Sequence, residues 1–173
     1  RECGTSTSNG TIIEFLPDPE IFEVLEYSYE TIADRMRELS FLNKGITVTL
    51  TDERELAEPA KGDEPQEGVF KNEVFYSENG LRDFVEYIDS TRETLIADVI
   101  HMSGEKAGIP VEVAMTYNTS YSENLFSDVN NINTHEGGTH LTGFRRGLTN
   151  TLKKYAEGSG MLNKLKFDIS GDD

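Results

Sequence analysis

Cysteine and basic residues are scarce in this sequence of 173 residues, and tryptophan is absent. Its single cysteine, Cys3, has no second cysteine with which to form an internal disulfide, and this suits the cytoplasm. No apolar run approaches the roughly 18 residues of a membrane-spanning helix, and no signal-peptide pattern opens the sequence. Because the first residue is Arg1 rather than methionine, we expect a fragment of a longer cytoplasmic protein.

Acidic residues dominate the charge, with 32 Asp and Glu against 16 Lys and Arg, for a net charge of −16. This balance excludes a surface that binds nucleic acid all over. The charge is uneven, because residues 1–138 hold 10 basic and 28 acidic residues, whereas residues 139–173 hold 6 and 4. Any attraction to a nucleic acid should therefore come from the last helix and its surroundings.

The apolar pattern predicts strands and helices in a mixed order. Ser28, Ser77 and Thr139 are expected to cap the three helices, and Gly45 to end the first of them. The expected order is a strand over 11–16, a helix from Ser28 to 43–45, strands over 46–50 and 69–76, a helix with Leu81, Phe84, Val85 and Ile88 on its apolar face, strands over 98–102, 111–117 and 124–131, a long helix after Thr139 and a strand over 164–169.

Residues 51–68 form the clearest break in this pattern, because they are rich in Asp, Glu, Pro and Gly. We interpret them as a mobile acidic surface loop. A cation site among Asp52, Glu53, Glu55 and Glu58 is the alternative, but solvated charge is the commoner outcome for such a run.

The stretch from Asn130 to His140 joins an extended apolar segment to the long helix, and Gly137 and Gly138 suit a turn there. Two functional interpretations compete with that structural one. His135, Glu136 and His140 resemble a scrambled zinc-protease motif, but its histidines are five apart rather than four and are separated by two glycines. A phosphate could bind at the glycine-rich helix start, but no Gly-Lys-Ser/Thr follows, so a P-loop is unsupported.

The residues from Asn130 to Arg145 closely resemble a stretch that the DNA gyrase B family carries in its transducer domain. Their sequence is Asn-Asn-Ile-Asn-Thr-His-Glu-Gly-Gly-Thr-His-Leu-Thr-Gly-Phe-Arg. Further matches, in the family's order, are Gly-Thr-Ile-Ile-Glu-Phe-Leu-Pro-Asp at 10–18, Arg-Glu-Leu-Ser-Phe-Leu-Asn at 37–43 and Ser-Tyr-Ser-Glu-Asn at 120–124. The resemblance covers nearly the whole chain.

We expect an α+β fold of two mixed-sheet pieces, each with helices on its sheet, divided near Glu78. The resemblance implies that residues 1–78 are the C-terminal part of an ATPase domain, with the acidic loop at 51–68. It implies that residues 79–173 are the N-terminal part of the transducer, which is similar to ribosomal protein S5 domain 2 and contains a left-handed βαβ crossover. The usual handedness rule opposes that crossover.

The resemblance also implies roles for three residues. Gly10 and Thr11 match a pair whose threonine lies in the family's adenine pocket, so they are expected to bind ATP. Arg145 matches an arginine that lines the cavity for captured DNA. The family's catalytic glutamate, Asp-x-Gly-x-Gly motif, ATP lid and Gln-Thr-Lys loop would all lie outside this sequence. We therefore expect no catalytic residue and no metal ligand here, and an inactive isolated fragment.

The implied parent is an ATP-hydrolysing type II DNA topoisomerase that uses ATP and Mg²⁺. It would couple nucleotide binding and hydrolysis to duplex capture, strand passage and negative supercoiling. Its partners would be DNA, the gyrase A subunit and a second gyrase B protein in an A2B2 holoenzyme, without a membrane. The composition alone also suits another class, an acidic protein-interaction domain without enzymatic activity.

Overall fold

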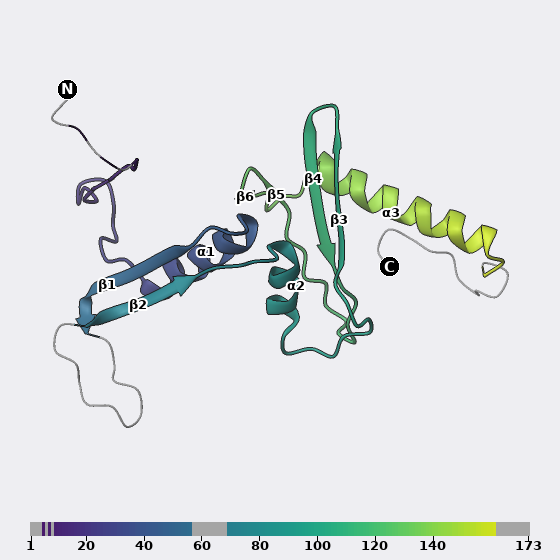
Figure 1. The fold of residues 1–173 in the computed structure, drawn as a ribbon, viewed down its shortest axis with the longest axis horizontal. Coiled ribbons are helices and arrows are strands. Elements are labelled where there is room, and N and C mark those ends of the chain that lie inside the picture. The colour runs from purple at the N-terminus through teal and green to yellow at the C-terminus, as the bar shows by residue number, and fades with distance from the viewer. Residues whose placement is uncertain (1–4, 6, 8, 57–68, 162–173) are drawn as a thin grey trace.

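A computed structural model describes residues 5, 7, 9–56 and 69–161 of the chain (Figure 1). Helices and strands are mixed along this part of the chain, as predicted. Their order is α1 (Tyr29–Leu42), β1 (Val48–Leu56), β2 (Phe70–Phe75), α2 (Leu81–Asp89), β3 (Ile100–Lys106), β4 (Ile109–Met115), β5 (Asp128–Val129), β6 (Ile132–Asn133) and α3 (Thr139–Gly158). None of the helices in the described ranges is long and apolar enough to cross a membrane.

Helix α1 begins and ends where the sequence predicts. The Ser28 hydroxyl accepts a hydrogen bond from the backbone N–H of Thr31 at 3.3 Å, which satisfies one of the amides left unpaired at a helix start. At the other end, the N–H of Asn43 donates to the Leu39 carbonyl, and Gly45 takes a positive φ of 83°. The helix packs against both strands of the first hairpin and against α2.

Strands β1 and β2 form an antiparallel hairpin, with Val48 opposite Phe75 and Asp52 opposite Lys71. β1 extends to Leu56, so the prediction that a loop begins at Thr51 was wrong. The apolar pattern did not predict this part of β1, because its side chains are mostly polar. Its backbone is nevertheless paired with β2. The rest of the predicted loop, 57–68, lies outside the described residues.

The predicted strand over residues 11–16 was also wrong, because these residues form neither helix nor strand. The side chains of Ile12 and Leu16 are 97% and 90% exposed. A strand is stabilised by hydrogen bonds to a neighbouring strand, and none of the described strands pairs with this segment. Its β-forming composition therefore has no described sheet to join.

Phe84 of α2 lies at the centre of an aromatic cluster that gathers distant parts of the chain. Its ring stacks on that of Phe41 of α1 at 5.3 Å and meets the ring of Phe126 edge-on at 5.1 Å. Phe41 also contacts Tyr87 at 5.6 Å. Phe84 is only 8% exposed, so the apolar face predicted for this helix is confirmed, and the cluster joins α1, α2 and the segment before β5.

The start of α2 differs from the prediction in detail. Its N-cap is Gly80, at a φ of 63°, rather than Ser77. Ser77 instead accepts a hydrogen bond from the Gly80 N–H at 2.8 Å and donates one to Asp83 at 2.7 Å. Its hydroxyl thus stabilises the turn that leads into the helix, ahead of the cap itself.

Two further hairpins have two-residue turns with positive φ at both positions. Ala107 and Gly108 connect β3 to β4, and Asn130 and Asn131 connect β5 to β6. This is the backbone of a type I′ turn, which favours asparagine and glycine. The predicted strand over 124–131 was therefore wrong in its extent, because only Asp128–Val129 is strand and the asparagine pair turns the chain back.

All the described strand pairs are antiparallel and occur as three two-stranded sheets. This finding corrects the expectation of mixed sheets. Helix α3 starts at Thr139 with Gly138 as its N-cap, so the predicted cap was one residue late. It extends away from the other described elements (Figure 1) and packs against none of their helices or strands. The predicted final strand, 164–169, lies outside the described residues.

Candidate functional site

Gly10 and Thr11, the predicted nucleotide-binding residues, lie in the N-terminal segment ahead of α1. Both are exposed, and a Cβ added at Gly10 would meet nothing within 4 Å. A cavity beside Asp89 and another beside Asp52 do not include them. Their role in ATP binding therefore remains a prediction.

Arg145, the predicted DNA-facing residue, lies in the second turn of α3. Its Nη2 donates to both carboxylate oxygens of Glu123, at 2.8 Å to Oε1 and 2.7 Å to Oε2. The Arg145 side chain is 33% exposed and that of Glu123 is 65% exposed. Arg146 is exposed, whereas Arg145 is partly covered, as expected for neighbours that point about 100° apart around a helix.

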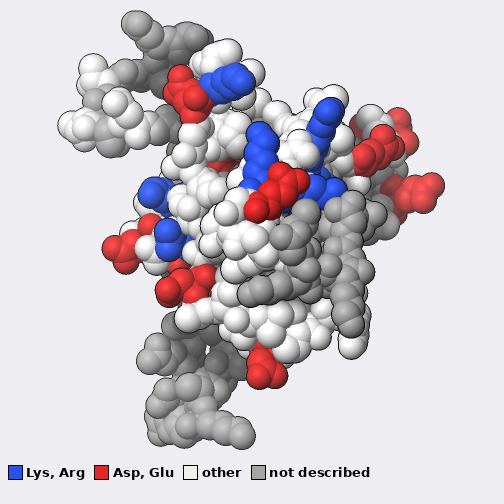
Figure 2. All heavy atoms as spheres, turned by 90° about the vertical axis from the view of Figure 1, so that its right-hand side faces the viewer, with Lys and Arg blue, Asp and Glu red and all other residues white. Residues whose placement is uncertain are grey.

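Helix α3 is the most basic element of the described chain, with Arg145, Arg146, Lys153 and Lys154 against Glu157. Figure 2 looks at the molecule from the side toward which α3 extends. Basic side chains gather on the upper part of this face, with acidic side chains among them and around its edge. The positive charge is thus local and partly neutralised, in agreement with the uneven charge of the sequence.

A chain of polar contacts fixes the segment that carries Glu123. The N–H of Ser120 donates to Asn118 Oδ1 at 2.8 Å, and the hydroxyls of Ser120 and Ser122 are 2.8 Å apart. Asn118 in turn donates to Asp89 Oδ1 at 2.6 Å. Arg92 reaches both ends of this chain, 3.5 Å from Ser122 Oγ and 3.6 Å from Asp89 Oδ1. The segment is therefore anchored to the end of α2.

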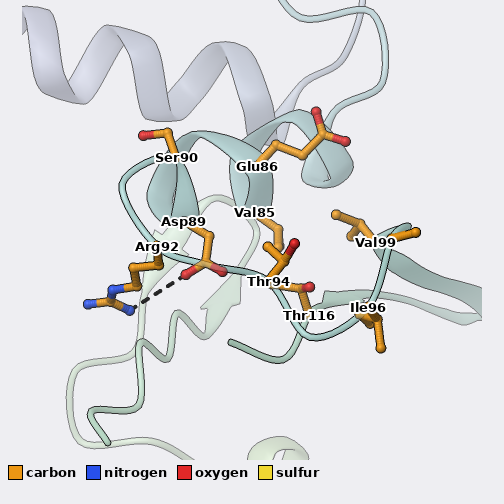
Figure 3. A pocket seen from close by; sticks show the side chains of 10 residues that line it. Val85, Glu86, Asp89, Ser90, Arg92, Thr94, Ile96, Val99 and Thr116 are labelled. Carbon is orange, nitrogen blue, oxygen red and sulfur yellow. Dashed lines mark ion pairs between the residues drawn. The ribbon is translucent and has the colours of Figure 1, made fainter. Parts of the chain in front are cut away.

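A cavity of about 290 Å³ lies beside these contacts, between α2, the segment after it and the end of β4 (Figure 3). Asp89 and Arg92 form an ion pair in its wall. Asp89 is 7% exposed, and its Oδ2 has no hydrogen-bond partner among the described residues. That oxygen has almost no accessible surface, so a ligand in the cavity would not reach it. The remaining lining residues are Val85, Glu86, Ser90, Thr94, Ile96, Ala97, Val99 and Thr116.

The position of the His140 side chain accounts for much of the Gly-Gly turn, and this account needs no metal ion. Its Nε2 lies 2.7 Å from the hydroxyl of Ser127, which also contacts Thr134. A Cβ on Gly138 would lie 2.7 Å from the His140 ring, so glycine leaves room for that ring. Gly137 takes a φ of 72°, which glycine adopts easily. Within the described ranges, no three His, Cys, Asp or Glu side chains are placed to hold a metal ion together.

Asp52 also differs from its predicted state of solvated charge. It is 8% exposed in β1, and Arg54 binds its two carboxylate oxygens at 2.8 and 2.6 Å. The side-chain and backbone hydrogen bonds from Arg54 lower the pKa of Asp52 to about 2. This carboxylate is therefore held by a neighbouring cation of its own strand.

Sequence reasoning did not single out Glu123 or Arg92. Glu123 belongs to the Ser-Tyr-Ser-Glu-Asn stretch that resembles the gyrase B family, but its partner lies 22 positions further along the chain. Helical i,i+4 spacing reveals charge pairs within one helix, whereas no local pattern reveals a pair between a loop and a later helix.

Comparison with known proteins identifies the family of this chain. The profile of the DNA gyrase B family matches residues 80–173. The DNA gyrase B protein of Cytophaga aurantiaca is 60% identical over 173 residues, which is 100% of this chain and 34% of that protein. The chain therefore spans between about a quarter and about a third of the length of the curated relatives it matches.

Two solved structures have the same fold. The 43K ATPase domain of Thermus thermophilus gyrase B, determined with an aminocoumarin, gives a TM-score of 0.70 at 27% identity, over 90% of this chain and 39% of that one. The gyrase B protein of Myxococcus xanthus gives 0.68 at 22% identity, over 82% and 36%, and shows the fold alone. The sequence resemblance is thereby confirmed: this chain belongs to the DNA gyrase B family and is a fragment of a gyrase B protein.

Proposed function

We propose that this chain joins the end of an ATPase domain, residues 1–78, to the start of a transducer domain, residues 79–173. The family match that begins at residue 80 supports this division. The transducer part is proposed to have the fold of ribosomal protein S5 domain 2. The ring contacts of Phe41 with Phe84 and Tyr87 cross the division, so a movement of one part would be transmitted to the other through packed side chains.

The complete gyrase B protein is proposed to be an ATP-hydrolysing type II topoisomerase that works in the cytoplasm with Mg²⁺. It would couple ATP binding and hydrolysis to capture of a DNA duplex, strand passage and negative supercoiling. Its partners would be DNA, the gyrase A subunit and a second gyrase B protein in an A2B2 assembly. The observation that carries this proposal is 60% identity, over the whole of this chain, to a DNA gyrase B protein.

Three residues carry proposed roles in that activity. Gly10 and Thr11 would contact the adenine of ATP, and their exposure leaves them accessible to a nucleotide and to the rest of the domain. Arg145 would face captured DNA, and its place on the most basic described helix supports this role. Basic side chains are common partners of DNA phosphates.

The test uses the complete gyrase B protein, purified with its A subunit, on relaxed plasmid DNA. We expect negative supercoils that require ATP and Mg²⁺ and that do not accumulate catalytically with a non-hydrolysable ATP analogue. The A subunit alone is the matched control. An assembly that binds partner proteins but introduces no supercoils with ATP would favour the acidic interaction domain and refute the proposal.

A further inference from the structure

The carboxylate of Glu123 binds the guanidinium group of Arg145, which is the group that would meet DNA. Its two carboxylate oxygens both lie within 2.8 Å of Nη2 of Arg145. A carboxylate and a phosphate oxygen offer the same kind of acceptor to arginine. A DNA phosphate that approaches Arg145 from this side therefore meets a site that already holds an anion.

The position of the Glu123 carboxylate is restrained, because the residues on both sides of Glu123 contact Arg92. Ser122 Oγ lies 3.5 Å from Arg92 Nη2. Arg92 Nη1 lies 2.6 Å from the side-chain amide of Asn124, in the orientation that lets the amide oxygen accept. Glu123 is thus presented toward α3 by a segment anchored to α2, and the ion pair with Arg145 joins that segment to α3.

The strength of the ion pair between Glu123 and Arg145 determines whether Glu123 blocks the binding of DNA to Arg145 or is displaced by a DNA phosphate. Both side chains keep access to solvent, at 33% and 65%, and exposed ion pairs are weak because water screens them. A phosphate of duplex DNA, with its dense line of charge, can therefore displace the carboxylate. The displaced carboxylate of Glu123 then repels the phosphate that has replaced it. Glu123 therefore lowers the affinity of Arg145 for DNA without abolishing it.

We infer that Glu123 is an intramolecular competitor of DNA phosphate for Arg145, so that duplex capture exchanges a protein carboxylate for a phosphate at this guanidinium. The inference rests on the proposed function, because it needs Arg145 to face DNA. It adds Glu123 to the proposed DNA-binding site, as a residue that weakens the binding of DNA.

The experiment measures the half-saturating concentration of mixed-sequence linear duplex for DNA-stimulated ATPase, in the complete gyrase B protein with its A subunit, over a salt titration. Glu123→Gln should lower this concentration about two- to fivefold, the effect of an exposed ion pair. It should also steepen the salt dependence by less than one phosphate contact, because the DNA counterion released at Arg145 is then no longer offset by a freed carboxylate that attracts a cation. Arg145→Gln should raise the concentration.

Controls separate this competition from general charge effects. Glu105→Gln makes the same charge change at an exposed residue of β3 and should leave the concentration unchanged. In an Arg145→Gln background, Glu123→Gln should lose its effect. If Arg145→Gln raises the concentration while Glu123→Gln leaves it unchanged or raises it too, Glu123 is not a competitor. The inference then fails, while the proposed role of Arg145 stands. If Arg145→Gln has no effect, the proposed role of Arg145 fails, and the competition with it.

Discussion

The side-chain amide of Asn131 donates a hydrogen bond to Oδ1 of Asn43 at 2.8 Å, across 88 positions of sequence. Arg35 strengthens the same junction by donating to the Asn131 carbonyl at 2.7 Å. The turn between β5 and β6 is thereby attached to α1. Because Asn131 also adopts a positive φ of 64°, one residue serves both the turn and the contact.

Thr11→Ala in the complete gyrase B protein should weaken nucleotide binding by up to about tenfold, because a neutral hydrogen bond contributes roughly 0.5–1.5 kcal/mol. Isothermal calorimetry with a non-hydrolysable ATP analogue measures this change. Thr11→Ser keeps the hydroxyl and is the matched control. Equal affinities for wild type and Thr11→Ala would leave Thr11 without a role in the nucleotide site.

Arg145→Gln in the holoenzyme should impair supercoiling and DNA-stimulated ATPase by more than it impairs nucleotide binding. Loss of one phosphate contact should reduce the salt slope of DNA binding by about one unit and weaken binding uniformly across sequences. Gel assays of supercoiling across a salt titration measure the effect. Normal supercoiling by the variant at every salt concentration would make Arg145 a surface charge.

The 173-residue chain alone should hydrolyse no ATP. Its sequence contains neither an Asp-x-Gly-x-Gly nor a Gln-Thr-Lys motif, and positioned base and charge stabilisation are needed together for phosphoryl transfer. A coupled phosphate-release assay, with the complete gyrase B protein as the positive control, measures this. Turnover above the buffer blank that survives repurification and scales with the chain would contradict the expectation.

Asp128→Asn should raise the melting temperature of the complete gyrase B protein at neutral pH. Burial, and then the nearby carboxylate of Glu38, raise the pKa of Asp128, although Arg35 and His135 oppose this. Its Oδ1 is buried without a hydrogen-bond partner in the described residues. A raised folded pKa stabilises the fold most below the unfolded value, and this contribution is lost as pH rises through the folded pKa.

Asparagine removes the charge at every pH, so its advantage should shrink as the pH falls toward the ordinary aspartate range near about 4. Melting curves of both proteins across this range measure the difference. Glu105→Gln controls for a change of net charge. A variant that melts below wild type at neutral pH would show that the Asp128 carboxylate forms a net stabilising interaction with Arg35 or His135.

The helices could be predicted from the sequence because their signals are local. Ser28 and Gly45 lie at the ends of α1, and Phe84 lies on the buried face of α2, as the spacing indicates. Strands depend on partners elsewhere. Residues 11–16 have strand composition without a described partner, whereas Thr51 to Leu56 have little apolar signal but belong to a strand that pairs with β2.

The candidate site could be predicted only in part, for the same reason. Arg145 was found through its neighbours in sequence, which resemble the gyrase B family. Glu123 and Arg92 were not found as its surroundings, because their contacts depend on how a loop and α3 are placed in space. A single sequence shows which side chains carry charge, but not which charges lie opposite one another.

Each described two-stranded hairpin leaves two outer edges whose backbone N–H and C=O groups pair with no other described strand. Together with exposed apolar side chains such as Ile12, Ile109 and Val111, these edges are templates on which further strands can add. At high concentration the isolated chain should therefore self-associate through its edges. Measurements on the isolated chain are therefore best made at low concentration.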